Sequence, residues 1–156
     1  MALNVVLFQP EIPPNTGNIA RTCAATATKL HLIKPLGFSI DDKHVKRAGL
    51  DYWDLLDLTL YDSLDELFIK YKESRFFFIT TKGKKLYTEV EYIDGDFIVF
   101  GRETAGLPQE VRQAHEETCL RIPMIENDKA RSLNLSNSVN IVLYEALRQT
   151  GFKSLI

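Results

Sequence analysis

Short apolar runs recur along the chain and alternate with longer stretches in which apolar residues repeat at helical spacing. Such short runs, bounded by glycine, proline or polar residues, are typical of strands that are buried on both faces. We expect strands at residues 4–8, 31–33, 58–61, 75–80, 97–100 and 120–124.

The stretches between these runs predict helices. Ile19, Cys23 and Ala27 give one helix an apolar face. We expect Asn15 to cap this helix, which would then begin near Thr16. Strands that alternate with helices predict a single-domain α/β fold, with a parallel sheet covered by helices on both faces. Further helices are predicted to begin at Asp41 or Asp42, after a capping-box pattern at Ser63, at Pro108, and within residues 132–140.

The last third of the chain contains the pattern most typical of a ligand site. A glycine loop, 101–106, follows the expected strand 97–100, and a polar loop, 127–131, follows the expected strand 120–124. Ligands of open α/β sheets bind in crevices at the carboxyl ends of strands, so the two loops predict a binding crevice. The glycine loop matches neither a P-loop nor a dinucleotide fingerprint, and two plain turns are the alternative interpretation.

The net charge, the cysteines and the length of the apolar runs limit the classes of protein to which this chain can belong. The net charge of −2 gives no overall attraction for nucleic acid, although a local cluster of Lys and Arg can still bind it. Two distant cysteines, Cys23 and Cys119, predict neither a disulfide framework nor a metal site, and a reducing cytoplasm fits them. No apolar run approaches the roughly 20 residues of a membrane helix, so we expect no membrane span.

Three blocks of residues, taken together, go beyond a generic α/β pattern. They are residues 15–21, residues 101–108, and residues 122–124 together with 132–137. In this order and spacing they resemble the three motifs of SPOUT-class RNA 2′-O-ribose methyltransferases, and the match is closest to the minimal YibK/TrmL-like branch. The resemblance covers nearly the whole chain.

The resemblance implies an S-adenosylmethionine site inside a C-terminal trefoil knot. It also implies an obligate homodimer, in which each site borrows residues across the interface, and no metal. The implied reaction is methylation of the ribose 2′-hydroxyl at wobble position 34 of tRNA, on a cytidine or a 5-carboxymethylaminomethyluridine. The implied partner is therefore the anticodon region of tRNA.

The matched positions imply three groups of site residues. We expect Arg21 to act near the ribose hydroxyl and Glu103 to orient Arg21 or the glycine loop. The expected catalytic set is Asn15, Arg21, Glu103, Ser132, Asn134 and Tyr144. The expected cofactor-binding set is Thr80, Gly101, Gly106, Ile122, Met124, Ser132, Leu133 and Ser136. The expected RNA-binding set is Lys43, Lys46, Arg47, Lys129 and Arg131, and a second basic run, Lys82, Lys84 and Lys85, is a further candidate.

Several of these positions also have an ordinary structural interpretation. Asn15 or Asn134 can simply cap a helix, and Ile122 and Met124 can be core residues. Three functional alternatives remain beside the wobble methyltransferase. They are a 2′-O-methyltransferase of another RNA, a catalytically inactive RNA-binding or cofactor-sensing module on the same scaffold, and an unrelated nucleotide-binding protein.

Overall fold

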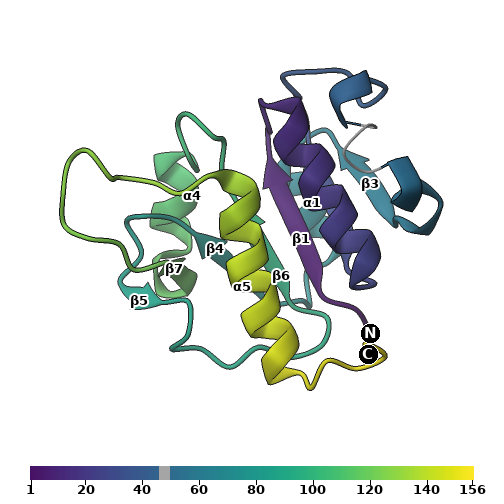
Figure 1. Ribbon diagram of the computed structural model, residues 1–156. Coiled ribbons are helices and arrows are strands. Elements are labelled where there is room, and N and C mark those ends of the chain that lie inside the picture. The colour runs from purple at the N-terminus through teal and green to yellow at the C-terminus, as the bar shows by residue number, and fades with distance from the viewer. Residues whose placement is uncertain (46–49) are drawn as a thin grey trace.

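The computed structural model describes residues 1–45 and 50–156. They form a sheet of seven strands in the order β3-β2-β1-β6-β4-β7-β5 (Figure 1), and every neighbouring pair is parallel. From one edge to the other, the strands are β3 (Leu58–Tyr61), β2 (Lys29–Ile33), β1 (Asn4–Phe8), β6 (Phe97–Phe100), β4 (Phe76–Ile79), β7 (Cys119–Arg121) and β5 (Lys85–Leu86).

Helices cover both faces of this sheet (Figure 1). Helices α1 (Pro13–Ala25) and α5 (Leu135–Gln149) pack on one face. Helices α3 (Leu64–Lys70) and α4 (Gln109–Ala114) pack on the other. Two short 3₁₀ helices, η1 (Leu50–Leu55) and η2 (Glu116–Thr118), precede β3 and β7. The predicted α/β fold is therefore confirmed, and no helix in the described ranges is long and apolar enough to cross a membrane.

The two layers of helices explain the continuous apolar runs in the sequence. In β1, Val5 and Leu7 belong to the core under α1 and α5, whereas Val6 and Phe8 belong to the core under α3 and α4. Successive side chains of a strand point to opposite faces, so a strand covered on both faces is apolar at every position.

The start of α1 differs from the prediction. Ile12 occupies the N-cap position and Pro13 begins the helix, so Asn15 lies inside the first turn and does not cap it. Proline fits this first turn because its missing N–H would have no partner there. Ala27 was expected on the buried face of this helix, but it lies beyond the helix end and is exposed.

Other helix boundaries follow their signals more closely. Ser63 caps α3 by accepting a hydrogen bond from the N–H of Glu66, as predicted. Asn134 caps α5, and its side-chain oxygen accepts hydrogen bonds from the N–H groups of Ser136 and Asn137. Gly151, with a φ of +84°, ends α5 in a Schellman motif.

One predicted strand is shorter than expected, and one predicted helix lies partly outside the described residues. The strand expected over 120–124 ends at Arg121. In the predicted basic helix after Asp42, residues 43–45 are helical, and Lys46 and Arg47 lie outside the described residues.

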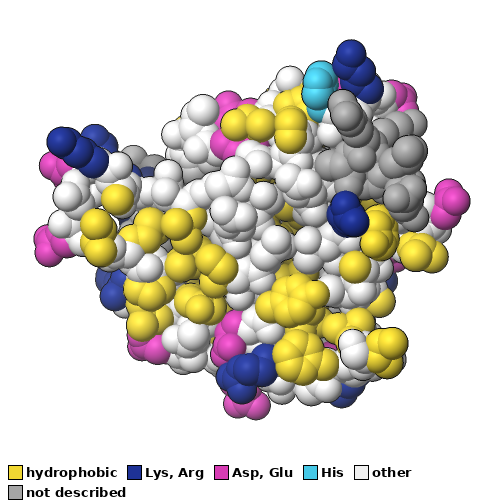
Figure 2. All heavy atoms as spheres, viewed as in Figure 1, with side chains coloured by type: hydrophobic (Ala, Val, Ile, Leu, Met, Phe, Trp, Pro, Cys, Tyr) yellow, Lys and Arg dark blue, Asp and Glu magenta, His cyan; other side chains and the backbone are white. Residues whose placement is uncertain are grey.

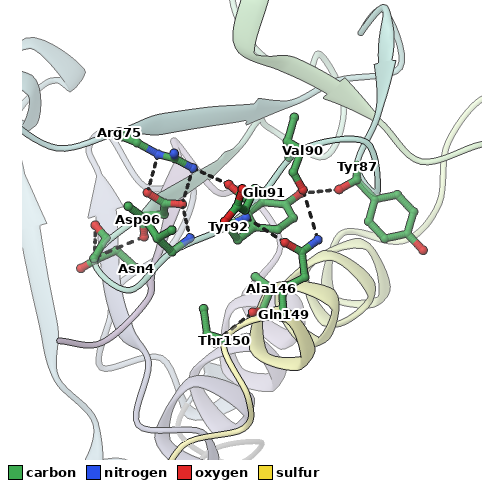
Figure 3. Close-up of polar contacts among 12 residues, drawn as sticks. Asn4, Arg75, Tyr87, Val90, Glu91, Tyr92, Asp96, Ala146, Gln149 and Thr150 are labelled. Atoms are coloured by element: carbon green, nitrogen blue, oxygen red, sulfur yellow. Dashed lines mark hydrogen bonds and ion pairs between the residues drawn. The ribbon is translucent and has the colours of Figure 1, made fainter.

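A polar network joins the start of β6 to the end of α5 (Figure 3). The Arg75 guanidinium donates to both carboxylate oxygens of the buried Asp96, at 2.9 Å each. The Gln149 side chain accepts from the N–H of Tyr92 and donates to the carbonyl of Val90, at 2.8 and 3.1 Å. This network lies where strands begin, so the opposite ends of the strands are left for a binding site.

Candidate functional site

A cavity of about 650 Å³ lies where three neighbouring strands end. Thr80 follows β4, Gly101 follows β6 and Ile122 follows β7, and all three residues line the cavity. The polar segment before α5 completes its wall. The sequence predicted a crevice at this position, and the structure confirms the crevice.

Most of the residues predicted to hold the cofactor lie together in this cavity. Its lining includes Thr80, Gly101, Gly106, Ile122, Met124, Ser132 and Leu133. Ser136 is the exception, because it is buried in the first turn of α5 and its hydroxyl donates to Oδ1 of Asn134 at 2.7 Å. Ser136 therefore positions Asn134 and does not reach the cavity.

Two glycines close the loop between β6 and α4 on itself. Arg102 and Gly106 exchange backbone hydrogen bonds of 3.2 and 3.0 Å, and Gly106 has a φ of +65°. A Cβ on Gly101 would lie only 2.3 Å from the carbonyl carbon of Gly106. Glycine at position 101 therefore lets the loop fold back tightly, and its backbone faces the cavity at close range.

A chain of side-chain hydrogen bonds links the three sequence blocks beside the cavity. Asn134 donates to Oδ1 of Asn15 at 3.1 Å, and Asn15 donates to Oε2 of Glu103 at 3.3 Å. The Glu103 carboxylate also accepts from the N–H groups of Glu11 and Ile12, at 2.9 and 2.8 Å. These bonds satisfy N–H groups at the start of α1 that have no partner within the helix.

The Glu11 carboxylate, in turn, forms hydrogen bonds with Thr104 of the glycine loop. Its carboxylate accepts from the N–H of Thr104 at 3.1 Å and from the Thr104 hydroxyl at 2.8 Å. These bonds lower the pKa of Glu11 below its usual value. Glu11 was not among the predicted site residues, although it lies only four residues before the first of the three blocks. Its partner is 93 residues away in the chain, which a local pattern cannot reveal.

Arg21 and Tyr144 do not line the cavity of their own chain. Arg21 lies six residues after Asn15, about 9 Å further along the helix axis. Its guanidinium lies over the ring of Tyr52, 5.0 Å from the centroid. The Glu103 carboxylate bonds the start of α1 and Asn15, so it holds the glycine loop that carries it against this helix, and no described contact joins it to Arg21. Tyr144 is exposed on α5.

The residues predicted to bind RNA are spread over several segments. Arg131 lines the cavity, and its Nε donates to the carbonyl of Asp128 at 2.6 Å. Lys129 is exposed on the same loop, and Lys43 is exposed at the start of its short helix. The remaining candidates, Lys46 and Arg47, lie outside the described residues.

Among the described residues, no histidine or cysteine lines this cavity. Burial lowers the pKa of His31 to about 4. Its ring contacts Asn4 and Tyr61 inside the core, at 2.9 Å each. Both cysteines are buried, and burial raises the pKa of each thiol. In the described parts of the chain, no cluster of ligating side chains could hold a metal ion.

Comparison with solved structures shows the class of protein that this fold and cavity define. A structure described as giving insights into the 2-OH methylation of C/U34 on tRNA has a TM-score of 0.89 and 45% identity, and the match covers 95% of each chain. An AdoMet-bound rRNA methyltransferase from Sinorhizobium meliloti has a TM-score of 0.76 and 25% identity, over 94% of this chain and 56% of that one. The class is that of the RNA methyltransferases.

Sequence comparison gives the family. Residues 2–144 match the SpoU rRNA Methylase family. A protein of Bacillus subtilis (strain 168), provisionally named as a tRNA (cytidine(34)-2′-O)-methyltransferase, is 59% identical over 158 residues, which span 99% of this chain and 98% of that protein. The chain belongs to the SpoU methylase family, and the resemblance drawn from its three blocks is confirmed.

Proposed function

We propose that this protein transfers a methyl group from S-adenosylmethionine to the ribose 2′-hydroxyl of the wobble nucleotide of tRNA. The target is cytidine 34 or 5-carboxymethylaminomethyluridine 34, and the reaction takes place in the cytoplasm. The observation that carries the proposal is the hydrogen-bonded chain Asn134–Asn15–Glu103, which joins all three family blocks beside one cavity. The close relatives named above support tRNA as the substrate.

The cavity fits the cofactor in size and in chemistry. Its volume of about 650 Å³ lies in the range of about 300–1,000 Å³ that is usual for small-molecule sites. Ile122, Met124 and Leu133 offer apolar surface for a flat base, and the tight glycine loop offers backbone groups. When bound, S-adenosylmethionine supplies a methyl group on a positively charged sulfur, so the protein has to supply position and polarity.

In this proposal Asn15, Glu103 and Asn134 hold the cavity wall in place, and Ser132 contacts the bound molecules from the loop before α5. Arg21 orients the substrate and stabilises the oxyanion that develops at the ribose. A guanidinium donates hydrogen bonds and accepts none, so Arg21 acts through charge and position and not as a base. Tyr144 lies near the target nucleotide, and Lys43, Lys46, Arg47, Lys129 and Arg131 contact the RNA.

The positions of Arg21 and Tyr144 support a homodimer. Both side chains are exposed and absent from the cavity lining of their own chain, so a second copy would have to bring them to the reaction. They belong to α1 and α5, which cover the face seen in Figure 2. Charged side chains on this face lie mostly toward its edges, and apolar side chains form patches to the left of and below its centre (Figure 2). A trefoil knot around the cofactor completes the proposal.

The test combines binding with methyl transfer. Calorimetry with S-adenosylhomocysteine should show a single site per chain, and labelled methyl groups should appear in total tRNA at position 34. Arg21→Ala should lose transfer at least about a hundredfold while retaining cofactor binding, as expected for a group that stabilises developing charge. Arg148→Ala, which removes an exposed arginine paired with Glu145, is the matched control.

Other outcomes would favour the alternatives. Labelling of a different RNA, mapped by nucleotide, would replace the tRNA substrate. Binding of S-adenosylhomocysteine without transfer to any RNA would indicate an inactive module. Loss of cofactor binding in Arg21→Ala with normal catalysis at saturation would contradict the role of that residue.

A further inference from the structure

A second, smaller hollow of about 240 Å³ adjoins the cavity. Both are lined by Thr80, Lys82 and Arg112, so the two spaces share one wall. The rest of the hollow is formed by Lys84 on the loop after β4, by Gln113 on α4, and by Glu116 and Cys119 beyond it.

The loop that carries Lys82 is held firmly in place. The N–H of Lys82 donates to the Thr80 hydroxyl at 3.2 Å, and the N–H of Gly83 donates to the Thr80 carbonyl at 3.1 Å. The Arg121 guanidinium donates to the carbonyls of Gly83 and Lys84, at 3.3 and 2.9 Å. Gly83 packs so closely on β7 that a Cβ there would lie 2.5 Å from the Leu120 carbonyl carbon. The base of the Lys82 side chain is therefore fixed and does not move with a flexible loop.

The hollow has an excess of positive charge. Lys84 forms an ion pair with Glu116 at 2.7 Å, which raises the pKa of the lysine and lowers that of the glutamate. In the described part of the chain, no carboxylate lies within ion-pair distance of Lys82 or Arg112. Burial raises the pKa of the Cys119 thiol, so this residue remains neutral and offsets neither cation. Two cations therefore line a half-open hollow in which neither has a carboxylate of the described residues within ion-pair distance.

We infer that this hollow binds a backbone phosphate of the substrate RNA, one that neighbours the nucleotide being methylated. The inference rests on the proposed function, because the reacting ribose has to enter the adjoining cavity. A half-open site with one guanidinium, whose Nε also donates to the Leu107 carbonyl at 3.4 Å, and one lysine suits a phosphate, which offers several acceptor oxygens. Phosphate contacts of this kind carry no sequence information, but they fix the register of the RNA on the protein.

The carboxylate of the bound cofactor is a second possible source of the same anionic chemistry, and binding measurements separate the two sources. A phosphate contact affects affinity for tRNA, whereas a carboxylate contact affects affinity for S-adenosylhomocysteine. Methylthioadenosine shares the adenosine and sulfur of that ligand but has no carboxylate, so it controls for any general damage to the cavity.

The experiment compares Lys82→Gln, Arg112→Gln and the double variant with Lys72→Gln. Lys72 is exposed on the segment after α3 and lines neither space. Binding to labelled total tRNA is measured from 50 to 200 mM salt, with S-adenosylhomocysteine and methylthioadenosine affinities in parallel. Lys82→Gln and Arg112→Gln, the hollow variants, should each weaken tRNA binding about three- to tenfold. Each should also reduce the salt slope, the slope of log affinity against log salt concentration, by about 0.7–0.9, the value for one phosphate contact. Lys72→Gln should change neither quantity.

Two results would overturn the inference. One is tRNA affinity and salt slope in the hollow variants equal to those of Lys72→Gln. The other is weakened binding of S-adenosylhomocysteine, but not of methylthioadenosine, which would assign the cations to the cofactor. Methyl transfer by the unaltered protein is measured separately, so a failure of the proposed function is distinguishable from a failure of this site. Equal melting temperatures of the variants exclude loss of folding as a cause.

Discussion

Glu103 and Asn15 are hydrogen-bonded at 3.3 Å although 88 residues separate them in the chain. The same carboxylate closes the start of α1 by accepting from two backbone N–H groups. One side chain of the glycine loop therefore determines where the first helix begins and how Asn15 faces the cavity.

Replacing Glu103 with Gln should weaken both the helix start and the cavity. The neutral amide keeps one acceptor but loses the charge that favours a helix N-terminus, so we expect a loss of about 1–2 kcal/mol in unfolding free energy. Affinity for S-adenosylhomocysteine should fall as well. Denaturant unfolding and calorimetry measure the two effects. Glu126→Gln, on an exposed stretch of loop, should show neither.

The two glycines of the loop should respond differently to alanine. Gly101→Ala places a Cβ against the backbone of Gly106, which cannot yield locally, so we expect more than about 2 kcal/mol of destabilisation and loss of cofactor binding. In Gly106→Ala the new Cβ has no atom within 4 Å. The substitution should therefore lower the unfolding free energy only through the unfavourable φ of +65°, by about 1–2 kcal/mol. Thermal unfolding with and without S-adenosylhomocysteine checks the order. Equal effects would show that steric closure at position 101 is unimportant.

Stability should depend on pH through His31. Its pKa is about 4 in the folded protein, below the usual value of about 6.5, so the unfolded chain binds the proton more readily. Stability is therefore fully present above pH 6.5 and decreases as the pH falls toward 4, by an amount on the order of 3 kcal/mol. Denaturant midpoints across this window measure the slope. His31→Gln should flatten it, and an unchanged slope in that variant would assign the effect to other groups.

The ion pair of the buried Asp96 with the exposed Arg75 and the exposed pair Asp94–Lys153 should differ in their contribution to stability. Burial raises the pKa of Asp96 although the N–H of Ile93 and Arg75 act in the opposite direction, so removal of its charge also removes a desolvation cost. We expect Asp96→Asn to cost about 1–3 kcal/mol without altering cofactor affinity, since it lies at the other end of the sheet. Asp94→Asn removes the exposed pair with Lys153 and should cost less than about 1 kcal/mol. A larger loss in Asp94→Asn than in Asp96→Asn would contradict this ordering.

The elements that the sequence predicted well are those whose signals are local. The runs 4–8 and 97–100 match β1 and β6 because burial on both faces makes every position apolar except Asn4, the first residue of β1. The caps at Ser63 and Asn134 act within three residues of themselves. Strand β5 was missed because Lys85 and Leu86 form too short a segment to show any period.

The sequence predicted the location of the site but not the hydrogen bonds that connect its residues. Two loops after two strands indicated the cavity, whereas the start of α1 depends on Glu103, which no local rule connects to residue 12. For the same reason Asn15 was assigned as a cap, while its actual partners are Asn134 and Glu103. The position of Arg21 over Tyr52 likewise depends on how α1 packs against η1.

Asn134 both caps α5 and donates to Asn15, so the last helix and the first one meet at a single side chain. During synthesis the residues of α1 emerge long before those of α5, because chains grow from the amino end. A partly made chain therefore has the glycine loop and α1 but lacks one wall of the cavity. Under the proposed function, the methyl donor binds the complete cavity only after the final helix has docked, and it then stabilises that docked state by mass action.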